Sequence, residues 1–306
     1  MERNGILVLH KPRGYTSHDC VMKIRKIFQT KKVGHTGTLD PDVNGVLPIC
    51  IGKATKVVQY MSGYDKEYNG EVTLGYSTTT EDRSGELVEK KPVLESWTKE
   101  EIKSILNDFK GDIVQIPPMY SAVKVNGKRL YEYAREGKVI DRPKRNVFIK
   151  RLELTSNIDA SNEVVRFRFN VLCSKGTYVR TLAVDIGKRL GYPAHMSDLV
   201  RVGAGPYQLE DSITFEQLEE LKNRGELDSI LTPFETAISH FPKHVVDSRI
   251  ETSVKNGAVL PFNTQSIRFS IYNQSGECLA IYKEHPDKQG FYKPEKMFWT
   301  GGQPLS

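Results

Sequence analysis

The sequence predicts an α+β protein made of two domains of unequal size. The chain has 306 residues, and a single domain usually takes roughly 100–200 of them, so two domains are expected. Strand-like and helix-like segments follow one another at irregular spacing, which favours α+β over a doubly wound parallel sheet. With 38% apolar and 27% charged residues, the composition is globular and excludes fibrous and wholly disordered classes.

The N-terminal part predicts a strand, a helix, a turn-rich segment and a second strand, in that order. Gly5–Leu9 is a short apolar run typical of a strand. Residues 16–28 predict a helix, because a Thr-Ser cap precedes apolar residues at helical spacing. Glycine and aspartate dominate residues 34–45 and predict turns, whereas the apolar run Val46–Ile51 predicts a buried strand.

The middle of the chain predicts two strands, two helices and a hairpin. Thr98-x-x-Glu101 is a capping box that opens a helix, and Gly111 lies just past its end. Asn126-Gly127 is a two-residue hairpin turn. Alternation predicts strands at 71–76 and 165–173, and helical periodicity predicts a helix at about 178–190.

The chain changes character near its C-terminal end. From Thr214 the sequence becomes acidic and helical, and Thr232-Pro233 opens a further short helix. Beyond Pro242 only short strand-like runs follow. We therefore expect one domain over residues 1–240 and a small β-rich domain over residues 241–306.

Positive charge is concentrated in two segments. The net charge of the chain is +6, yet residues 124–151 alone carry ten Lys or Arg against three acids, and residues 11–32 carry seven against Asp19. Such segments in an otherwise acidic chain are typical of a protein that binds a polyanion. Charge by itself does not distinguish RNA from DNA or from a phosphorylated small molecule, and a solvated surface is the alternative.

Several classes of protein are not supported. No apolar run reaches the length of a membrane span, and Gly5–Leu9 is too short for the core of a signal peptide, so we expect a cytoplasmic protein that does not contact membranes. The four cysteines form no Cys-x-x-Cys pair, which indicates reduced thiols rather than disulfides or a zinc site. No HExxH pattern is present, and we expect no bound metal.

Asp40 lies in the turn-rich segment, directly ahead of an apolar strand. A phosphate-binding loop is excluded here because Ala54 stands where serine or threonine is needed, and a calcium loop because its twelfth position is Ile51. Aspartate before proline is ordinarily a turn former. However, the surrounding glycines let the backbone approach a ligand closely, so a reactive carboxylate is the alternative interpretation.

Five segments together resemble one known family. Gly34-His35-Thr36-Gly37-Thr38-Leu39-Asp40-Pro41, continued by Gly45–Ile49, is similar to the catalytic motif of the TruB-type tRNA pseudouridine synthases. Four more segments resemble the family's other motifs in the family's order: Lys11–Ser17, Lys66–Tyr68, Pro117–Tyr131 and Cys173–Arg180. The sequence departs from the family at Val200, where a second arginine is more frequent, and at Tyr207, where phenylalanine is.

This resemblance implies a fold and an activity. The fold would be that of a pseudouridine synthase, with a mixed, mainly antiparallel sheet flanked by helices and a small PUA-like domain at the C-terminus. The activity would be isomerisation of uridine 55 in the tRNA T-loop to pseudouridine, which needs no cofactor. The target base must be flipped out of the loop to react. The resemblance implies a tRNA partner that is bound through its T-arm.

The resemblance also implies roles for individual residues. Asp40, Tyr68 and Arg180 match the catalytic aspartate, the stacking tyrosine and the arginine that pairs with the aspartate. Residues at about 124–151 match an RNA-binding arm that closes over the T-loop. The residues expected to contact the substrate are His35, Tyr178, Leu199, Lys11, Lys124, Arg129, Lys144 and Arg145.

Two alternatives remain open on the sequence. One is a non-catalytic protein on the same scaffold that binds or folds tRNA, and the other is a pseudouridine synthase for another RNA. The presence of Asp40 favours catalysis, and the basic arm favours the T-arm as substrate. No protein partner is implied, and we expect a monomer.

Overall fold

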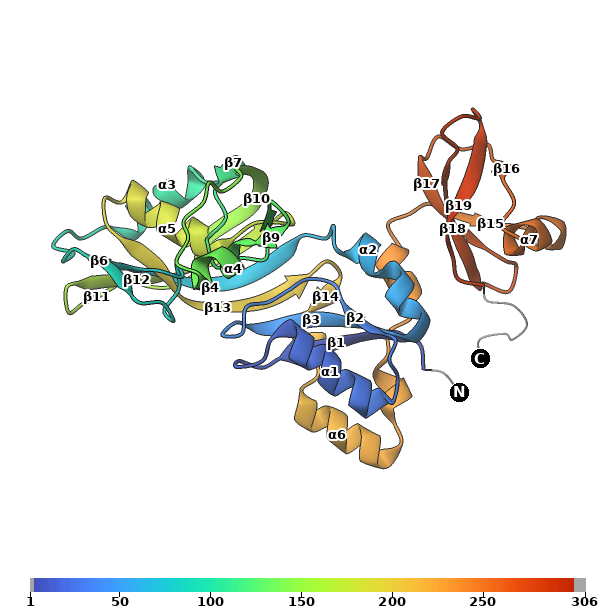
Figure 1. Ribbon diagram of the computed structural model, residues 1–306, viewed down its shortest axis with the longest axis horizontal. Helices are drawn as coiled ribbons and strands as arrows, with labels where there is room; N and C mark the ends of the chain where they lie inside the picture. Colours follow the sequence, from blue (N-terminus) through green and yellow to red (C-terminus); the bar gives the residue numbers. More distant parts are fainter. Residues whose placement is uncertain (1–2, 300–306) are drawn as a thin grey trace.

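The computed structural model describes residues 3–299 and contains two principal β-sheets (Figure 1). In spatial order the large sheet contains β1 (Gly5–Lys11), β3 (Asn44–Ile51), β13 (Ala194–Ala204), β4 (Lys66–Leu74), β12 (Val164–Cys173), β10 (Arg145–Leu154) and β7 (Gly111–Gln115). Three short strands join it at the side: β2 (Val33–His35), β11 (Asp159–Ser161) and β14 (Tyr207–Gln208). Within this described range, no helix has both the length and the apolar character to cross a membrane.

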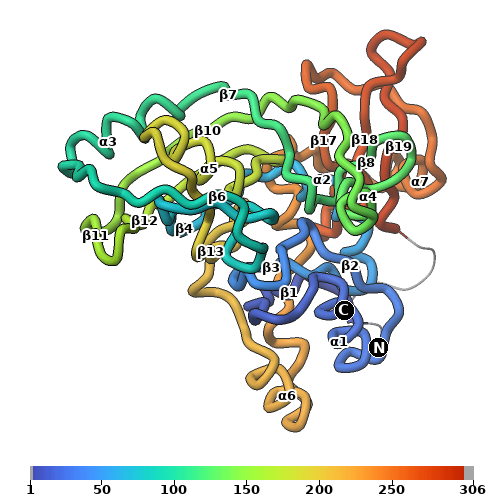
Figure 2. The backbone as a smooth tube through the Cα atoms, turned by 60° about the vertical axis from the view of Figure 1, so that its left-hand side comes forward, coloured from blue at the N-terminus to red at the C-terminus, as the bar shows by residue number. Residues whose placement is uncertain are grey.

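The large sheet is mixed and mainly antiparallel, as expected. Its one parallel pairing joins β13 to β3, and every other pairing within it is antiparallel. Four helices flank it: α1 (Ser17–Phe28), α3 (Lys99–Asn107), α5 (Val179–Arg189) and α6 (Phe215–Arg224). Figures 1 and 2 place α1 and α6 together at one end of the sheet, with α3 and α5 over the other end.

The predicted helices begin at the expected capping residues and bury the apolar face that their spacing predicts. Thr16 caps α1 in a capping box with Asp19, and the apolar face of α1 enters the core beneath the sheet. Thr98 caps α3 in the same way with Glu101. Apolar side chains of α1, α3 and α5 belong to one buried cluster. The α+β class and these helices are therefore confirmed.

The strands differ from prediction in two ways. The predicted strand at 71–76 is β4, which begins five residues earlier and ends before Gly75, where φ is +116°. β7, β10 and β13 did not stand out in the sequence. The basic segment at 124–151 is therefore not a single arm, because its residues from Arg145 onward form β10, hydrogen-bonded to β7 and β12.

The arm is the segment of residues 116–144, between β7 and β10. It contains the predicted hairpin, β8 (Lys124–Val125) and β9 (Lys128–Arg129), followed by α4 (Leu130–Arg135). Asn126 and Gly127 both have positive φ, as the two-residue turn requires. A second hairpin, β5 (Tyr76–Thr78) and β6 (Leu87–Lys90), projects from the same end of the large sheet (Figure 1).

The C-terminal region forms a separate five-stranded sheet. Its order is β15 (Lys243–Val245), β17 (Arg268–Tyr272), β18 (Cys278–Glu284), β19 (Phe291–Met297) and β16 (Leu260–Pro261), with α7 (Ser248–Lys255) alongside. This sheet shares a core with the rest of the chain. Phe298 and Ile281 are buried in one cluster with Ile6 and with Phe234 of the short 3-10 helix η4 (Phe234–Ile238).

Three further 3-10 helices and one short α-helix complete the described part of the chain. These are η1 (Gly52–Val57), α2 (Val58–Met61), η2 (Leu209–Asp211) and η3 (Leu227–Ile230). η1 and α2 lead from β3 back to β4 and lie between the large sheet and the C-terminal sheet (Figure 1).

Candidate active site

Asp40 lies in the loop between β2 and β3, and buried groups hold the backbone of that loop. The Lys11 ammonium donates hydrogen bonds to the carbonyl oxygens of Pro41, at 3.0 Å, and Val43, at 2.7 Å. The Ser17 hydroxyl accepts from the Leu39 amide at 2.9 Å. The loop is therefore fixed on both sides of Asp40, whose own side chain remains 43% exposed.

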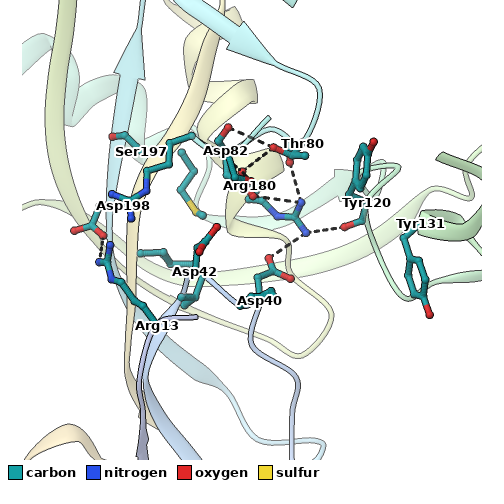
Figure 3. A pocket seen from close by; sticks show the side chains of 16 residues that line it. Arg13, Asp40, Asp42, Thr80, Asp82, Tyr120, Tyr131, Arg180, Ser197 and Asp198 are labelled. Atoms are coloured by element: carbon teal, nitrogen blue, oxygen red, sulfur yellow. Dashed lines mark hydrogen bonds and ion pairs between the residues drawn. The ribbon is translucent and has the colours of Figure 1, made fainter. Parts of the chain in front are cut away.

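Arg180 binds the Asp40 carboxylate. It lies in the first turn of α5, and its side chain is only 6% exposed. One terminal guanidinium nitrogen, Nη2, lies 3.1 Å from Asp40 Oδ2 and donates to the Tyr120 carbonyl at 2.8 Å, while the other, Nη1, donates to the Thr80 carbonyl at 2.8 Å (Figure 3). Arg180 therefore connects the Asp40 loop, the arm and the loop after β5 at one point.

Asp40 and Arg180 stand at the edge of a cleft of about 380 Å³. This size lies within the usual range for sites that enclose a small molecule. Tyr68 on β4, Tyr178 at the N-terminus of α5 and Leu199 on β13 also line the cleft. The structure thus brings together five residues that the sequence singled out, although they lie up to 159 positions apart.

A second cavity of about 240 Å³ adjoins the cleft and shares Asp40, Arg180 and Leu199 with it. Figure 3 shows two opposite sides of this cavity: Arg13 forms an ion pair with Asp198 on one side, and Tyr131 of the arm lies on the other. Asp40 therefore faces a space that extends in two directions, which suits an extended ligand better than a compact one.

Arg201 was not singled out in the sequence, and it forms much of the cleft floor. It is 1% exposed, and on β13 it lies directly opposite Tyr68 of β4. Its guanidinium donates to the carbonyl oxygens of Val46, at 2.6 Å, and Gly37, at 3.2 Å. Arg201 thereby fixes the backbone on both sides of Asp40.

Gly45 explains why glycine is needed beside the aspartate loop. Its φ is +113°, and a Cβ at this position would lie 2.1 Å from the carbonyl oxygen of Arg201. No side chain fits there, because β3 and β13 approach one another at this point in their parallel pairing. The glycine permits the close approach that brings Arg201 under the loop.

Burial shifts the pKa values of the cleft groups. It raises the pKa of the Tyr68 phenol, and the negative charge of Asp40 acts in the same direction, so the phenol is protonated at neutral pH. Burial, together with the charge of Arg201, lowers the pKa of Lys66 to about 8. Lys66 was likewise not singled out as a site residue, although it lines the cleft.

Tyr178 is held by a glutamine that sequence patterns did not identify. The Gln115 amide donates to the Tyr178 carbonyl at 3.2 Å, and its oxygen accepts from the Tyr178 amide at 2.9 Å. Gln115 is 1% exposed. This pair fixes the start of α5, and with it Arg180, to the end of β7.

Lys11 does not lie where a substrate contact is expected. Its side chain is fully buried, and its ammonium donates to three carbonyl oxygens of the protein, including that of Pro12 at 2.9 Å. A phosphate cannot reach it without unfolding the loop. The expected substrate contact of Lys11 has no support in this geometry, in which the side chain supports the Asp40 loop.

His35 is half-buried on β2 and does not belong to the cleft wall. Burial lowers the pKa of its imidazole, and the charge of Arg201 lowers it further, so the ring is neutral at pH 7. Its position beneath the loop leaves the expected RNA contact without support in the geometry.

The arm carries exposed cations. The side chains of Lys124, Arg129 and Lys144 face solvent, as does Arg145 at the start of β10, and Arg129 also donates to the Tyr131 phenol at 2.9 Å. Other basic residues of the 124–151 segment are paired with acids within the described part of the chain: Lys128 and Lys138 with Glu136, Arg142 with Glu81, Lys150 with Asp65, and Arg151 with Glu67. The free positive charge of the segment is thus smaller than its composition indicates.

The arrangement can hold a flat ring and present one carboxylate to it. The Tyr68 ring supplies a stacking surface, Arg180 orients the carboxylate, and buried cations line the floor. No group of three or more His, Cys, Asp or Glu side chains within residues 3–299 is arranged to hold a metal ion. The missed residues, Lys66, Gln115 and Arg201, are long polar side chains that become buried only once the strands pair.

Two family models match the chain in sequence. One, described as TruB family pseudouridylate synthase (N terminal domain), matches residues 25–179. The other, described as tRNA pseudouridylate synthase B C-terminal domain, matches residues 180–239. Together they cover the described cleft from the Asp40 loop to Arg201.

Individual proteins match over almost the whole chain. A tRNA pseudouridine synthase B of Halalkalibacterium halodurans is 61% identical over 300 residues, which is 97% of this chain and 98% of that protein. One of Bacillus subtilis is 54% identical, covering 96% of this chain and 97% of that protein. Among solved structures, a Cbf5-Nop10-Gar1 complex contains a chain that is 29% identical, with a TM-score of 0.71, over 96% of this chain and 85% of that one.

Proposed function

The chain belongs to the TruB family of pseudouridylate synthases, and on this premise we propose that it isomerises uridine 55 in the T-loop of tRNA to pseudouridine. Relatives that it matches along almost their full length are named tRNA pseudouridine synthase B, which supports tRNA as the substrate. The observation that carries the proposal is the Asp40–Arg180 pair at the edge of a cleft that also contains Tyr68.

The reaction needs one carboxylate and a way of holding a detached base. The bond between N1 of uracil and C1′ of the ribose breaks, the uracil turns, C5 bonds to C1′, and the proton on C5 leaves for N1 or solvent. Substrate and product have the same atoms, so no co-reactant is consumed. Asp40 supplies the carboxylate, and Arg180 fixes the direction in which that carboxylate points.

Access to the cleft requires the target nucleotide to leave the stacked loop. Flipping a base costs a few kcal/mol, which stacking and hydrogen bonds in the pocket must offset. Tyr68 is placed to stack on the base, and Tyr178 and Leu199 supply the apolar sides of the pocket. Since burial raises the pKa of the Tyr68 phenol, this group can hold or donate a proton but does not act as an anion.

The arm supplies contacts outside the pocket. Lys124, Arg129, Lys144 and Arg145 are exposed and can reach phosphates, which fix register without reading bases. We propose a division of labour in the chain, in which residues 1–240 carry catalysis and residues 241–306 add a PUA-like surface for the part of tRNA beyond the T-arm.

The direct test uses a T-arm stem-loop labelled with tritium at C5 of the target uridine. The purified full-length protein should release tritium into water without any added cofactor or metal, because C5 loses its hydrogen when it bonds to C1′. A stem-loop with cytidine at the target position should release none. Binding of the stem-loop without release of tritium would contradict the proposal and favour a protein that only binds or folds tRNA.

A further inference from the structure

One buried polar atom on the cleft wall has no role in the chemistry above. Within residues 3–299, six buried side-chain nitrogen or oxygen atoms lack a hydrogen-bond partner, on Arg25, His35, Asn44, Thr73, Ser121 and His195. Of these residues, only Ser121 lines the cleft. It is 6% exposed.

An unpaired hydroxyl at this place is informative. A buried polar group without a partner costs about 1–3 kcal/mol, and the large majority of such groups in native proteins are paired. A buried hydroxyl on the wall of a substrate cleft is therefore a candidate contact for the substrate. Thr73, on β4, carries a second unpaired hydroxyl, but it lies inside the sheet away from the cleft.

The position of Ser121 is fixed relative to Asp40. The carbonyl of the preceding residue, Tyr120, accepts from the same Arg180 nitrogen that lies 3.1 Å from the Asp40 carboxylate. The Ser121 carbonyl accepts from the Tyr131 amide at 3.1 Å. These two bonds hold the backbone of Ser121 next to the residue that shares the Arg180 guanidinium with Asp40.

We propose that the Ser121 hydroxyl hydrogen-bonds the ribose 2′-hydroxyl of the flipped uridine; this inference rests on the proposed function. The scissile bond is at C1′, so the ribose must lie beside Asp40, and its 2′-hydroxyl is on the adjacent carbon. A serine hydroxyl can both donate and accept, which matches a group that does the same. The proposal requires the hydroxyl to turn toward the cleft when RNA binds, through a change of staggered rotamer about Cα–Cβ.

The experiment is a binding cycle with two proteins and two RNAs. Wild type and Ser121→Ala, both full length, are titrated with a T-arm stem-loop and with the same stem-loop carrying a single 2′-deoxyuridine at the target position. We expect Ser121→Ala to weaken binding of the all-ribose RNA by about tenfold. Its effect on the deoxy RNA should be less than about twofold, because the partner is already absent.

Two readouts keep the result unambiguous. Thr73→Val removes the other buried unpaired hydroxyl and should leave both affinities unchanged. Ser121→Ala should unfold at the same temperature as wild type or a higher one, since the deleted hydroxyl has no partner in the free protein. Equal decreases of affinity on the two RNAs, or no decrease on either, would overturn the proposal. Tritium release by wild type is measured separately, so a failure of the proposed function is recognised on its own.

Discussion

The floor of the cleft and the arm both carry positive charge, but they place it differently. On the floor Lys66 and Arg201 are buried, as Lys11 is under the adjoining Asp40 loop, and all three cations donate to backbone carbonyls. On the arm, Lys124, Arg129 and Lys144 face solvent. A buried cation bound to carbonyls is costly to disturb and therefore shapes the site, whereas an exposed cation exchanges water for phosphate readily. Residue type alone does not distinguish the two roles.

The largest effect is expected at Arg180, which contacts both Asp40 and the arm residue Tyr120. Arg180→Lys keeps the charge but cannot hold Asp40, Thr80 and Tyr120 together, because an ammonium lacks the planar fork. Turnover should fall by about a hundredfold or more, with RNA affinity reduced much less. Arg168→Lys is the control, since Arg168 pairs with Glu71 on the open face of the sheet. Similar rates for both variants would contradict the account.

The next largest effect is a loss of stability, and it is expected at the buried lysine under the Asp40 loop. Lys11→Met leaves buried carbonyl oxygens of the Asp40 loop without a donor, so the free energy of unfolding should decrease by about 2–4 kcal/mol. Chemical denaturation of Lys144→Met, an exposed lysine of the arm, should show almost no change. Comparable decreases in the two variants would mean that burial does not separate the regions.

Changes to the exposed lysines of the arm should reduce the affinity for RNA. Replacing Lys124 and Lys144 by Gln should weaken binding of the T-arm about tenfold. The plot of log K against log salt should flatten by up to roughly 0.7–0.9 for each phosphate that the variant no longer neutralises. The matched double variant at Lys128 and Lys138 removes the same charge from residues that pair with Glu136. Its salt slope should change less, and equal slopes would make the whole arm a solvated surface.

The smallest effect concerns how the free energy of unfolding depends on pH, which we expect from a buried histidine and not from the arm. Burial lowers the pKa of His195, and the unfolded chain binds a proton that the folded chain excludes. The free energy of unfolding should therefore decrease as pH falls below about 6.5, by up to roughly 1.4 kcal/mol per pH unit. His195→Gln should flatten this dependence, while the arm carries no histidine and its variants should retain it. An unchanged slope in His195→Gln would assign the effect elsewhere.

Local signals predicted much of the fold because they act over a few residues. The helix cap at Thr16-Ser17, the capping box at Thr98 and the turn at Asn126-Gly127 each depend on side chains within four positions, and all three are confirmed. The turn-rich loop around Asp40 could also be predicted, because a positive φ such as that of Gly45 favours glycine, which the sequence shows directly.

What the sequence could not predict depends on strand pairing. Arg201 is buried only because β13 lies between β3 and β4, which places Tyr68 opposite its side chain. The family resemblance implies a substrate contact for Lys11, yet its ammonium binds carbonyls some thirty positions away. Arg145–Arg151 was assigned to the arm on charge, although alternate residues of this stretch are buried in β10. None of these interactions has a local signature.

In the proposed mechanism the carboxylate of Asp40 performs the chemistry while other residues hold the RNA. This division is tested most directly by Asp40→Asn, measured for both T-arm affinity and the single-turnover rate at saturating RNA. The account predicts an affinity within about threefold of wild type and a rate reduced by at least roughly 10³-fold, as is usual when an essential catalytic group is removed. Pseudouridine formation near the wild-type rate, with deamidation excluded by mass spectrometry, would contradict it.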